Sequence, residues 1–107
     1  GEKATPAHDL LKGLLNDDFD IVRIAAAEAL CKTGNCNDAI KILGEELLDE
    51  DIVTRLYAAI TILDLSNIPH YFMDKIHQSK KTEPKCIPEG NYLNSLKNAL
   101  QRIEANI

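Results

Sequence analysis

The sequence has no tryptophan, and aromatic residues make up only 5% of the chain. A core without large rings must be filled by Leu, Ile, Val and Ala, which pack well between helices. Long apolar runs are also missing, since none approaches the roughly 18 to 20 residues that span a bilayer. We also expect no signal peptide. With 45% hydrophobic and 27% charged residues in 107 positions, the composition predicts one globular domain without membrane insertion.

A basic stripe is absent as well. Residues 1–64 hold 6 Lys and Arg against 13 Asp and Glu, a net charge of -7, whereas residues 65–107 hold 6 against 4, a net charge of +2. Clustered Lys and Arg supply most of the affinity for phosphate backbones. The acidic first part therefore predicts that nucleic acid is not a partner.

Catalytic signatures are missing too. The sequence contains neither a glycine-rich phosphate loop nor a Gly-x-Ser-x-Gly elbow. Glu45 and Glu46 are adjacent, so a helix aims them about 100° apart, which suits a carboxylate pair poorly. His70 and His77 lie seven positions apart, whereas helical metal ligands usually lie three or four apart. We expect no catalytic, cofactor-binding or metal-binding residue in this segment, and no cofactor.

Cysteine occurs three times, as Cys31, Cys36 and Cys86, so the cysteines cannot all pair within one chain. Four residues separate Cys31 from Cys36 across an expected helix end, which is too far for a Cys-x-x-Cys redox pair. The sequence favours a small buried thiol for Cys31. A disulfide between Cys36 and Cys86, both in expected loops, is the weaker alternative.

The chain does contain an internal sequence similarity. The stretch from Ile21 to Asn35 returns in weaker form 32 positions later, where Arg23 corresponds to Arg55. The leucines of the preceding helix also recur, at an offset of 33. A fixed offset of this size predicts stacked helical repeats. The other matched pairs are Ala26 and Ala58, Ala27 and Ala59, Leu30 and Ile62, Asn35 and Asn67, Leu10 and Leu43, Leu14 and Leu47, and Leu15 and Leu48.

Start and stop signals divide the chain into six expected helices. Thr5 and Pro6 provide an N-cap and a proline at the first helical position, and Asp51 is the expected N-cap of the fourth helix. Gly34 and Asn35 tolerate the left-handed conformation that ends helices. The expected ranges are roughly ten residues from Pro6, about Asp20 to Thr33, a helix from Asn37 or Asp38, Ile52 to about Leu65, a short helix after Pro69 ending near Ser79, and a helix from about Asn91.

Apolar residues at intervals of three and four give each expected helix a buried face. A polar loop is expected between Ser79 and Gly90. The residues expected to face inward include Leu10, Leu11, Leu14 and Leu15 in the first helix and Tyr71, Phe72 and Ile76 in the fifth.

These elements predict an all-α fold of about three antiparallel helix pairs, stacked as a short right-handed α-solenoid. Residues 1–5 would be a loose lead-in, with Gly1 fitting a processed start or a cloning scar. Residues 6–107 would form a single repeat domain. We divide it into repeat one at 6–35, repeat two at 37–67 and a degenerate capping repeat at 69–107.

The acidic turn followed by Val22-Arg23 and then Ala26, Ala29 and Leu30 resembles the HEAT-repeat signature. The resemblance is good from Pro6 to Asn67 and poor beyond, and Thr54 stands where the pattern has valine. In that family the second-helix arginine often pairs with an aspartate of the inter-helix turn in an adjacent repeat. The resemblance therefore implies a structural ladder made of Arg23, Arg55, Asp17, Asp18, Asp49 and Asp51.

A narrower likeness concerns the run Arg55-Leu56-Tyr57-Ala58-Ala59, and Asn91-Tyr92-Leu93 before Ala99-Leu100. These runs resemble the HEAT-type extension that follows the catalytic domain of some bacterial sulfatases. This resemblance implies a C-terminal accessory domain of a larger sulfatase-like hydrolase. It also implies a periplasmic or extracellular location; without it, a cytoplasmic location is the expectation.

We interpret the segment as a non-catalytic structural or protein-interaction module, whose partner is an intramolecular catalytic domain or a separate protein. A free-standing scaffold remains an alternative, and a HEAT-built lyase or glycosylase would need a polar pocket or a basic groove. Arg23 or Arg55 on a concave surface could also hold a carboxylate or phosphate. Helical phase places the candidate interaction face at exposed positions Ile24, Glu28, Tyr57 and Thr61.

Overall fold

The start and stop residues of the sequence set the limits of six α-helices. The structure, a computed structural model, describes residues 6–34 and 36–107. No strand occurs in these two ranges, so the all-α prediction is confirmed. The expected roles of Thr5 and Asn35 fall outside the described residues. The helices are α1 (Pro6–Leu14), α2 (Asp20–Lys32), α3 (Asn37–Glu46), α4 (Ile52–Leu63), α5 (Phe72–Lys81) and α6 (Tyr92–Ala105).

The two acidic turns start their helices differently. Asp51 Oδ1 accepts a hydrogen bond from the Val53 amide at 3.0 Å, as expected of an N-cap. The N-cap of α2 is Phe19, which provides no side-chain cap, and Asp20 Oδ1 accepts a hydrogen bond from the neighbouring Ile21 amide at 2.7 Å. The end of α2 is followed by Gly34 with φ +92°, a conformation that side chains with a Cβ rarely adopt.

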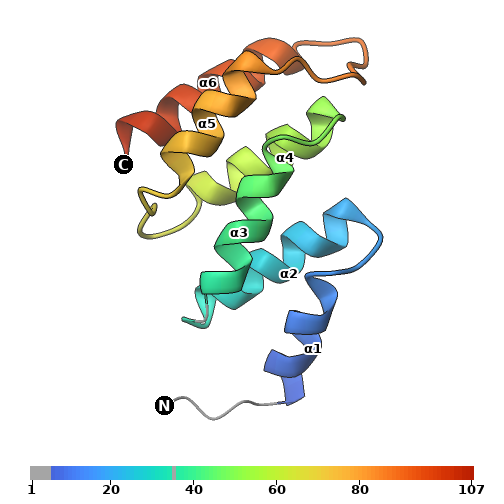
Figure 1. Ribbon diagram of the computed structural model, residues 1–107, viewed down its shortest axis with the longest axis vertical. Coiled ribbons are helices and arrows are strands. Elements are labelled where there is room, and N and C mark those ends of the chain that lie inside the picture. The colour runs from blue at the N-terminus through green and yellow to red at the C-terminus, as the bar shows by residue number, and fades with distance from the viewer. Residues whose placement is uncertain (1–5, 35) are drawn as a thin grey trace.

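Consecutive helices form hairpins that succeed one another along a long axis. The molecule measures 43 × 29 × 18 Å, and α1 and α6 lie toward opposite ends of it (Figure 1). Besides the contacts within hairpins, α2 contacts α3 and α4, α4 contacts α6, and α3 contacts α5. The second helices of successive hairpins, α2, α4 and α6, are therefore neighbours, and α4 lies between the other two.

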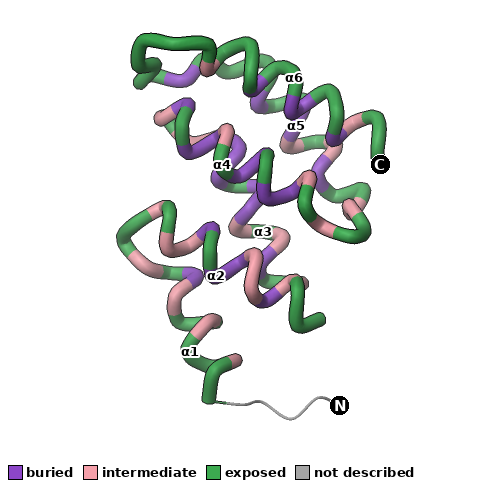
Figure 2. The backbone as a smooth tube through the Cα atoms, turned by 180° about the vertical axis from the view of Figure 1, so that it is seen from behind, coloured by how far each residue is buried: buried purple, intermediate pink, exposed green. Residues whose placement is uncertain are grey.

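The core follows this order of helices. Buried residues concentrate on the inner faces of the helices, with α4 rich in them (Figure 2). None of the residues of α1 is buried, and Leu10 is 64% exposed, so its expected place in the apolar face is wrong. The reason is that α1 packs against α2 and, among the described helices, has no second neighbour with which it makes an extensive contact.

A second residue that the sequence predicts to face inward, at the start of α5, is also exposed. Phe72 and Ile76 are fully buried as expected, whereas Tyr71 is 42% exposed. Its ring lies over Gly44 of α3, where a Cβ atom would come within 2.9 Å of Tyr71 Cε2. Tyr71 therefore covers a glycine at the contact between α3 and α5, outside the core.

The loop between α5 and α6 is held against the turn between α3 and α4. The Cys86 amide donates to the Glu50 carbonyl at 2.9 Å, and the Ile52 amide donates to the Cys86 carbonyl at 3.1 Å. Pro84 of the same loop is buried. The loop that the sequence predicts as polar is thus anchored by its backbone. In the described part of the chain, no helix is long and apolar enough to cross a membrane.

Candidate functional site

Arg23, on α2, is held by its own turn and by the following hairpin. Its Nε donates to Glu46 Oε1 on α3 at 2.6 Å, and its Nη1 donates to the backbone carbonyls of Asp17 at 2.8 Å and Asp18 at 3.2 Å. The hydrogen bond to Glu46 raises the pKa of Arg23 above its ordinary value. The guanidinium thus joins the first turn to the second hairpin.

Arg55, at the equivalent position on α4, is only 1% exposed. Its Nε donates to the Asp49 carbonyl at 2.5 Å, and Nη1 donates to the carbonyls of Thr82 at 2.6 Å and Ser79 at 3.3 Å. A longer contact joins Nη2 to the Leu48 carbonyl at 3.5 Å. Burial lowers the pKa of Arg55, which the charge of Asp49 partly opposes. Because each guanidinium nitrogen contacts a backbone carbonyl and the residue is buried, this arginine does not present a surface for a ligand.

The aspartates of the expected ladder do not contact the two arginines in the way that the resemblance implies. Asp17, Asp18 and Asp49 meet the arginines through backbone carbonyls. The side chain of Asp51 caps α4 instead. In the described chain, neither arginine is hydrogen-bonded to an aspartate carboxylate.

Glu46 is the partner that sequence reasoning missed. It is 5% exposed, and burial raises its pKa, against the lowering effect of the hydrogen bond from Arg23. The sequence contains a signal for the burial of Glu46, because Leu43 lies three residues before it and therefore on the same face of the helix. Both residues are buried on α3. An acid on an apolar face needs a buried partner.

The expected interaction face is only partly exposed. Tyr57 is 39% exposed and Glu28 is half-buried, but Ile24 is fully buried and Thr61 is 3% exposed. The expectation of exposure is wrong for Ile24 and Thr61. Helical phase alone missed this because α4 packs against α2 on one side and α6 on the other.

What remains open on this side is a groove of about 720 Å³, which we call the second-helix groove. Its floor is the apolar outer side of α4. Glu28 comes from α2, Asp64 from the end of α4 and Arg102 from α6, so both signs of charge border the floor. The lining residues are Glu28, Val53, Leu56, Tyr57, Ile60, Thr61, Leu63, Asp64 and Arg102. Such a surface can hold apolar side chains with charged flanks.

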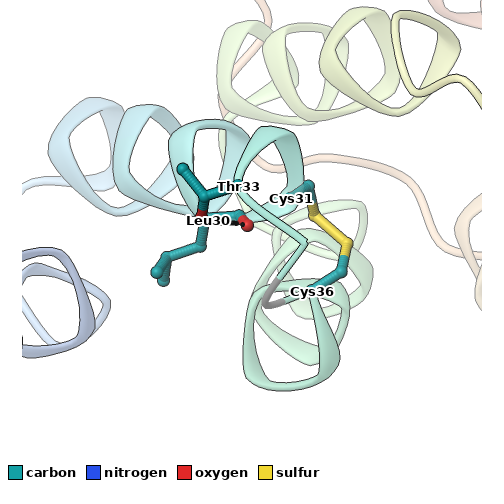
Figure 3. The surroundings of a disulfide bond; sticks show 4 residues. All are labelled: Leu30, Cys31, Thr33 and Cys36. Carbon is teal, nitrogen blue, oxygen red and sulfur yellow. Dashed lines mark hydrogen bonds between the residues drawn. A yellow bond between two sulfur atoms is a disulfide. The ribbon is translucent and has the colours of Figure 1, made fainter. Parts of the chain in front are cut away.

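The cysteines are not arranged as the sequence favours. Cys31 and Cys36 form a disulfide, with Cα atoms 4.2 Å apart, and Cys86 is an exposed free cysteine. Figure 3 shows the bond closing the turn between α2 and α3. The expectations of a free buried Cys31 thiol and of a bond between Cys36 and Cys86 are wrong. The physical reason is that the chain reverses here, which brings residues five positions apart together.

The histidines do not converge. His70 and His77 are both exposed, and the described residues contain no group of three His, Cys, Asp or Glu side chains that could hold a metal ion.

Comparison with known proteins gives no relative from which function could be transferred. The chain matches no family model, no curated protein and no solved structure.

Proposed function

We propose that this chain is a non-catalytic protein-interaction module, built as a short HEAT-like α-solenoid, whose second-helix groove holds a segment of a protein partner. The observation that carries the proposal is the groove itself. Val53, Tyr57 and Ile60 remain 38%, 39% and 56% exposed on one helix side. Apolar side chains that share one exposed surface are typical of a protein contact.

The repeat interpretation rests on contacts between hairpins. Arg23 and Arg55 occupy equivalent positions and both reach the following hairpin. Thr54 Oγ1 on α4 donates to Asp20 Oδ2 at the start of α2. Thr54 is 4% exposed, so the threonine that departs from the family pattern supplies a polar contact between neighbouring second helices.

The border of the groove indicates the chemistry of the partner. Glu28 on α2 and Asp64 at the end of α4 would attract a cationic flank, and Arg102 on α6 would attract a carboxylate. An amphipathic helix with leucines at i, i+3, i+4 and i+7, lysines on one flank and glutamates on the other fits this arrangement. Charge matching of this kind sets orientation more than affinity.

A synthetic helix of this design, about 15 residues long, tests the proposal by NMR titration of the labelled protein. We expect shifts at the amides of Tyr57 and Ile60, and a charge-swapped peptide should bind more weakly. Ile60→Asp should weaken binding at least tenfold, because a carboxylate would enter an apolar contact. Leu93→Asp is the matched control, since Leu93 is 52% exposed but does not line the groove.

Equal binding of both peptides, or binding that Ile60→Asp leaves unchanged, would contradict the groove as the binding site. Shifts confined to residues outside the groove would do the same.

The module also fits the C-terminal accessory domain of a larger, sulfatase-like hydrolase. The first hairpin supports this form of the proposal, because Leu10, Phe19 and Ile21 are 64%, 72% and 58% exposed. Terminal repeats of free-standing stacks usually carry a polar outer face. These three residues would contact the catalytic domain.

The parent gene provides the discriminating observation. A hydrolase domain encoded before Gly1 would support the accessory-domain form, and its absence would favour the free-standing scaffold. In a longer parent protein, hydrogen exchange at α1 should be slower than in the isolated segment. Equal exchange in both would contradict docking through the first hairpin.

A further inference from the structure

The disulfide lies at a junction of the fold. Cys31 belongs to the last turn of α2, and Cys36 immediately precedes α3. The two sulfurs have different surroundings, because Cys31 packs against the hydrophobic core whereas Cys36 lines a hollow of about 180 Å³. The other lining residues of the hollow are His8, Lys12, Leu30, Gly34, Asn37 and Asp38. An external thiol can therefore approach Cys36 more readily than Cys31.

The start of α3 favours a thiolate at Cys36. Cys36 is the N-cap residue, and in the described chain no side chain caps this helix end. Free amides and the helix dipole stabilise negative charge there. Lys12 of α1 lines the same hollow and adds positive charge, which the Asp38 carboxylate, 3.7 Å from Lys12 Nζ, partly offsets. The position of Cys36 at the start of α3 thus stabilises a thiolate that is released there during exchange.

We propose that Cys31 and Cys36 form a reversible dithiol–disulfide pair, in which Cys36 is the sulfur that exchanges with external thiols. The bond joins residues only five positions apart. A short closed loop restricts the unfolded chain less than a long one, so the fold depends less on this bond. Reduction releases the turn between the first and second hairpins.

The exchange is balanced with a dithiol reductant of the thioredoxin type. One reductant thiolate attacks Cys36 Sγ, the bond to Cys31 Sγ breaks, and Cys31 leaves as a thiolate that takes a proton from water. The second reductant thiol loses its proton and attacks the reductant sulfur of the mixed disulfide, which releases the Cys36 thiolate. Two electrons pass to the protein pair, and the reductant dithiol becomes a disulfide.

A redox titration of the Cys86→Ser variant tests reversibility. The folded protein is equilibrated in reduced and oxidised glutathione mixtures, quenched in acid and alkylated, and the free thiols are counted by mass spectrometry. We expect both thiols to appear together within the range of these mixtures. Structural disulfides resist reduction by glutathione, so a pair that stays oxidised until urea is added would overturn the proposal. A pair that never oxidises would also overturn it.

A second measurement tests whether Cys36 is the exchanging sulfur. In the Cys31→Ser variant, iodoacetamide should modify Cys36 faster than the exposed Cys86 at pH below 7. Each unit by which the pKa is lowered gives tenfold more thiolate but a weaker nucleophile, a net gain of roughly threefold. Lys12→Ala should slow the reaction at Cys36 and leave Cys86 unchanged.

Lys41→Ala is the matched control, because Lys41 is also exposed but does not line the hollow. Equal alkylation of Cys36 and Cys86, or equal effects of Lys12→Ala and Lys41→Ala, would overturn the assignment of Cys36.

Discussion

Arg23 and Arg55 occupy equivalent positions 32 residues apart but are held by different partners. Both donate to backbone carbonyls of the turn that precedes their own helix. Arg23 then reaches a carboxylate on the next hairpin, whereas Arg55 reaches the Thr82 and Ser79 carbonyls at the end of α5. Arg23 is partly exposed, whereas Arg55 is buried.

The comparison teaches that both arginines make the same kind of contact with the turn before their own helix, whereas their second contact depends on what the following hairpin offers. A guanidinium has five donors in a fixed fork, so it can serve both. Since the third hairpin offers no acid at this point, carbonyls replace the carboxylate. The two arginines should therefore respond differently to the same substitution.

The largest effect is expected for Arg55→Ala. It leaves the carbonyls of Asp49 and Thr82 and the buried carbonyl of Ser79 without their donor and empties a buried site. The free energy of unfolding should therefore fall by about 3–5 kcal/mol. Urea unfolding measures this loss. Arg55→Lys keeps the charge but has no fork, and it should fall between the wild type and Arg55→Ala. A loss from Arg55→Ala no larger than that from Arg23→Ala would break the comparison.

Arg23→Ala should cost less, about 2 kcal/mol, because water can reach part of the vacated site. Much of this cost comes from leaving Glu46 buried without its cation. Adding Glu46→Gln to Arg23→Ala should therefore restore part of the stability. A double variant that loses the sum of both single effects would show that the two side chains act independently.

Glu46→Gln should change how stability depends on pH. Because the folded state raises the pKa of Glu46 above 4.5, the protonated group favours folding at low pH. This contribution is complete below the unfolded pKa and is lost as the pH rises through the folded pKa. The stability of the wild type relative to Glu46→Gln should thus be greatest in acid and decrease toward neutral pH. Parallel pH curves for the two proteins would contradict the raised pKa.

The smallest effect is expected for Thr54→Val. The side chains have nearly the same shape, so the substitution mainly removes the hydrogen bond to Asp20, a loss of about 1 kcal/mol. Thermal and urea unfolding measure it. Thr61→Val is the control, because Thr61 is buried to a similar degree but bonds to the Tyr57 carbonyl of its own helix. A larger loss of stability from the control would contradict a specific contribution of the hydrogen bond between α2 and α4.

Sequence reasoning located the helices well because their signals are local. Pro6, Gly34 and Asp51 each act within one turn of the chain, and each lies at the helix end that the sequence predicts. It failed for the cysteines, because spacing does not reveal how tightly the chain reverses between α2 and α3. It also failed for Leu10, which is expected inside but is exposed, and for Ile24, which is expected outside but is buried. Both are apolar, and only the neighbouring helices decide which one is covered.

Of the residues that line the groove, the sequence predicts Glu28, Tyr57 and Thr61 as part of an interaction face. The remaining border of the groove includes Arg102 from α6, which no spacing rule relates to α2 or α4. Likewise, Glu46 shows no sequence link to Arg23, from which it is separated by 23 positions. Such contacts depend on how the hairpins pack.

By itself the sequence determined an all-helical chain with an internal sequence similarity at an offset of 32 residues, because periodicity, capping and chain breaking act over a few residues. The tertiary structure decided which oxygens satisfy each arginine, which cysteines join and which side of α4 stays open. These outcomes depend on groups brought together by packing between helices, where burial and hydrogen bonding choose among partners that the sequence leaves equivalent.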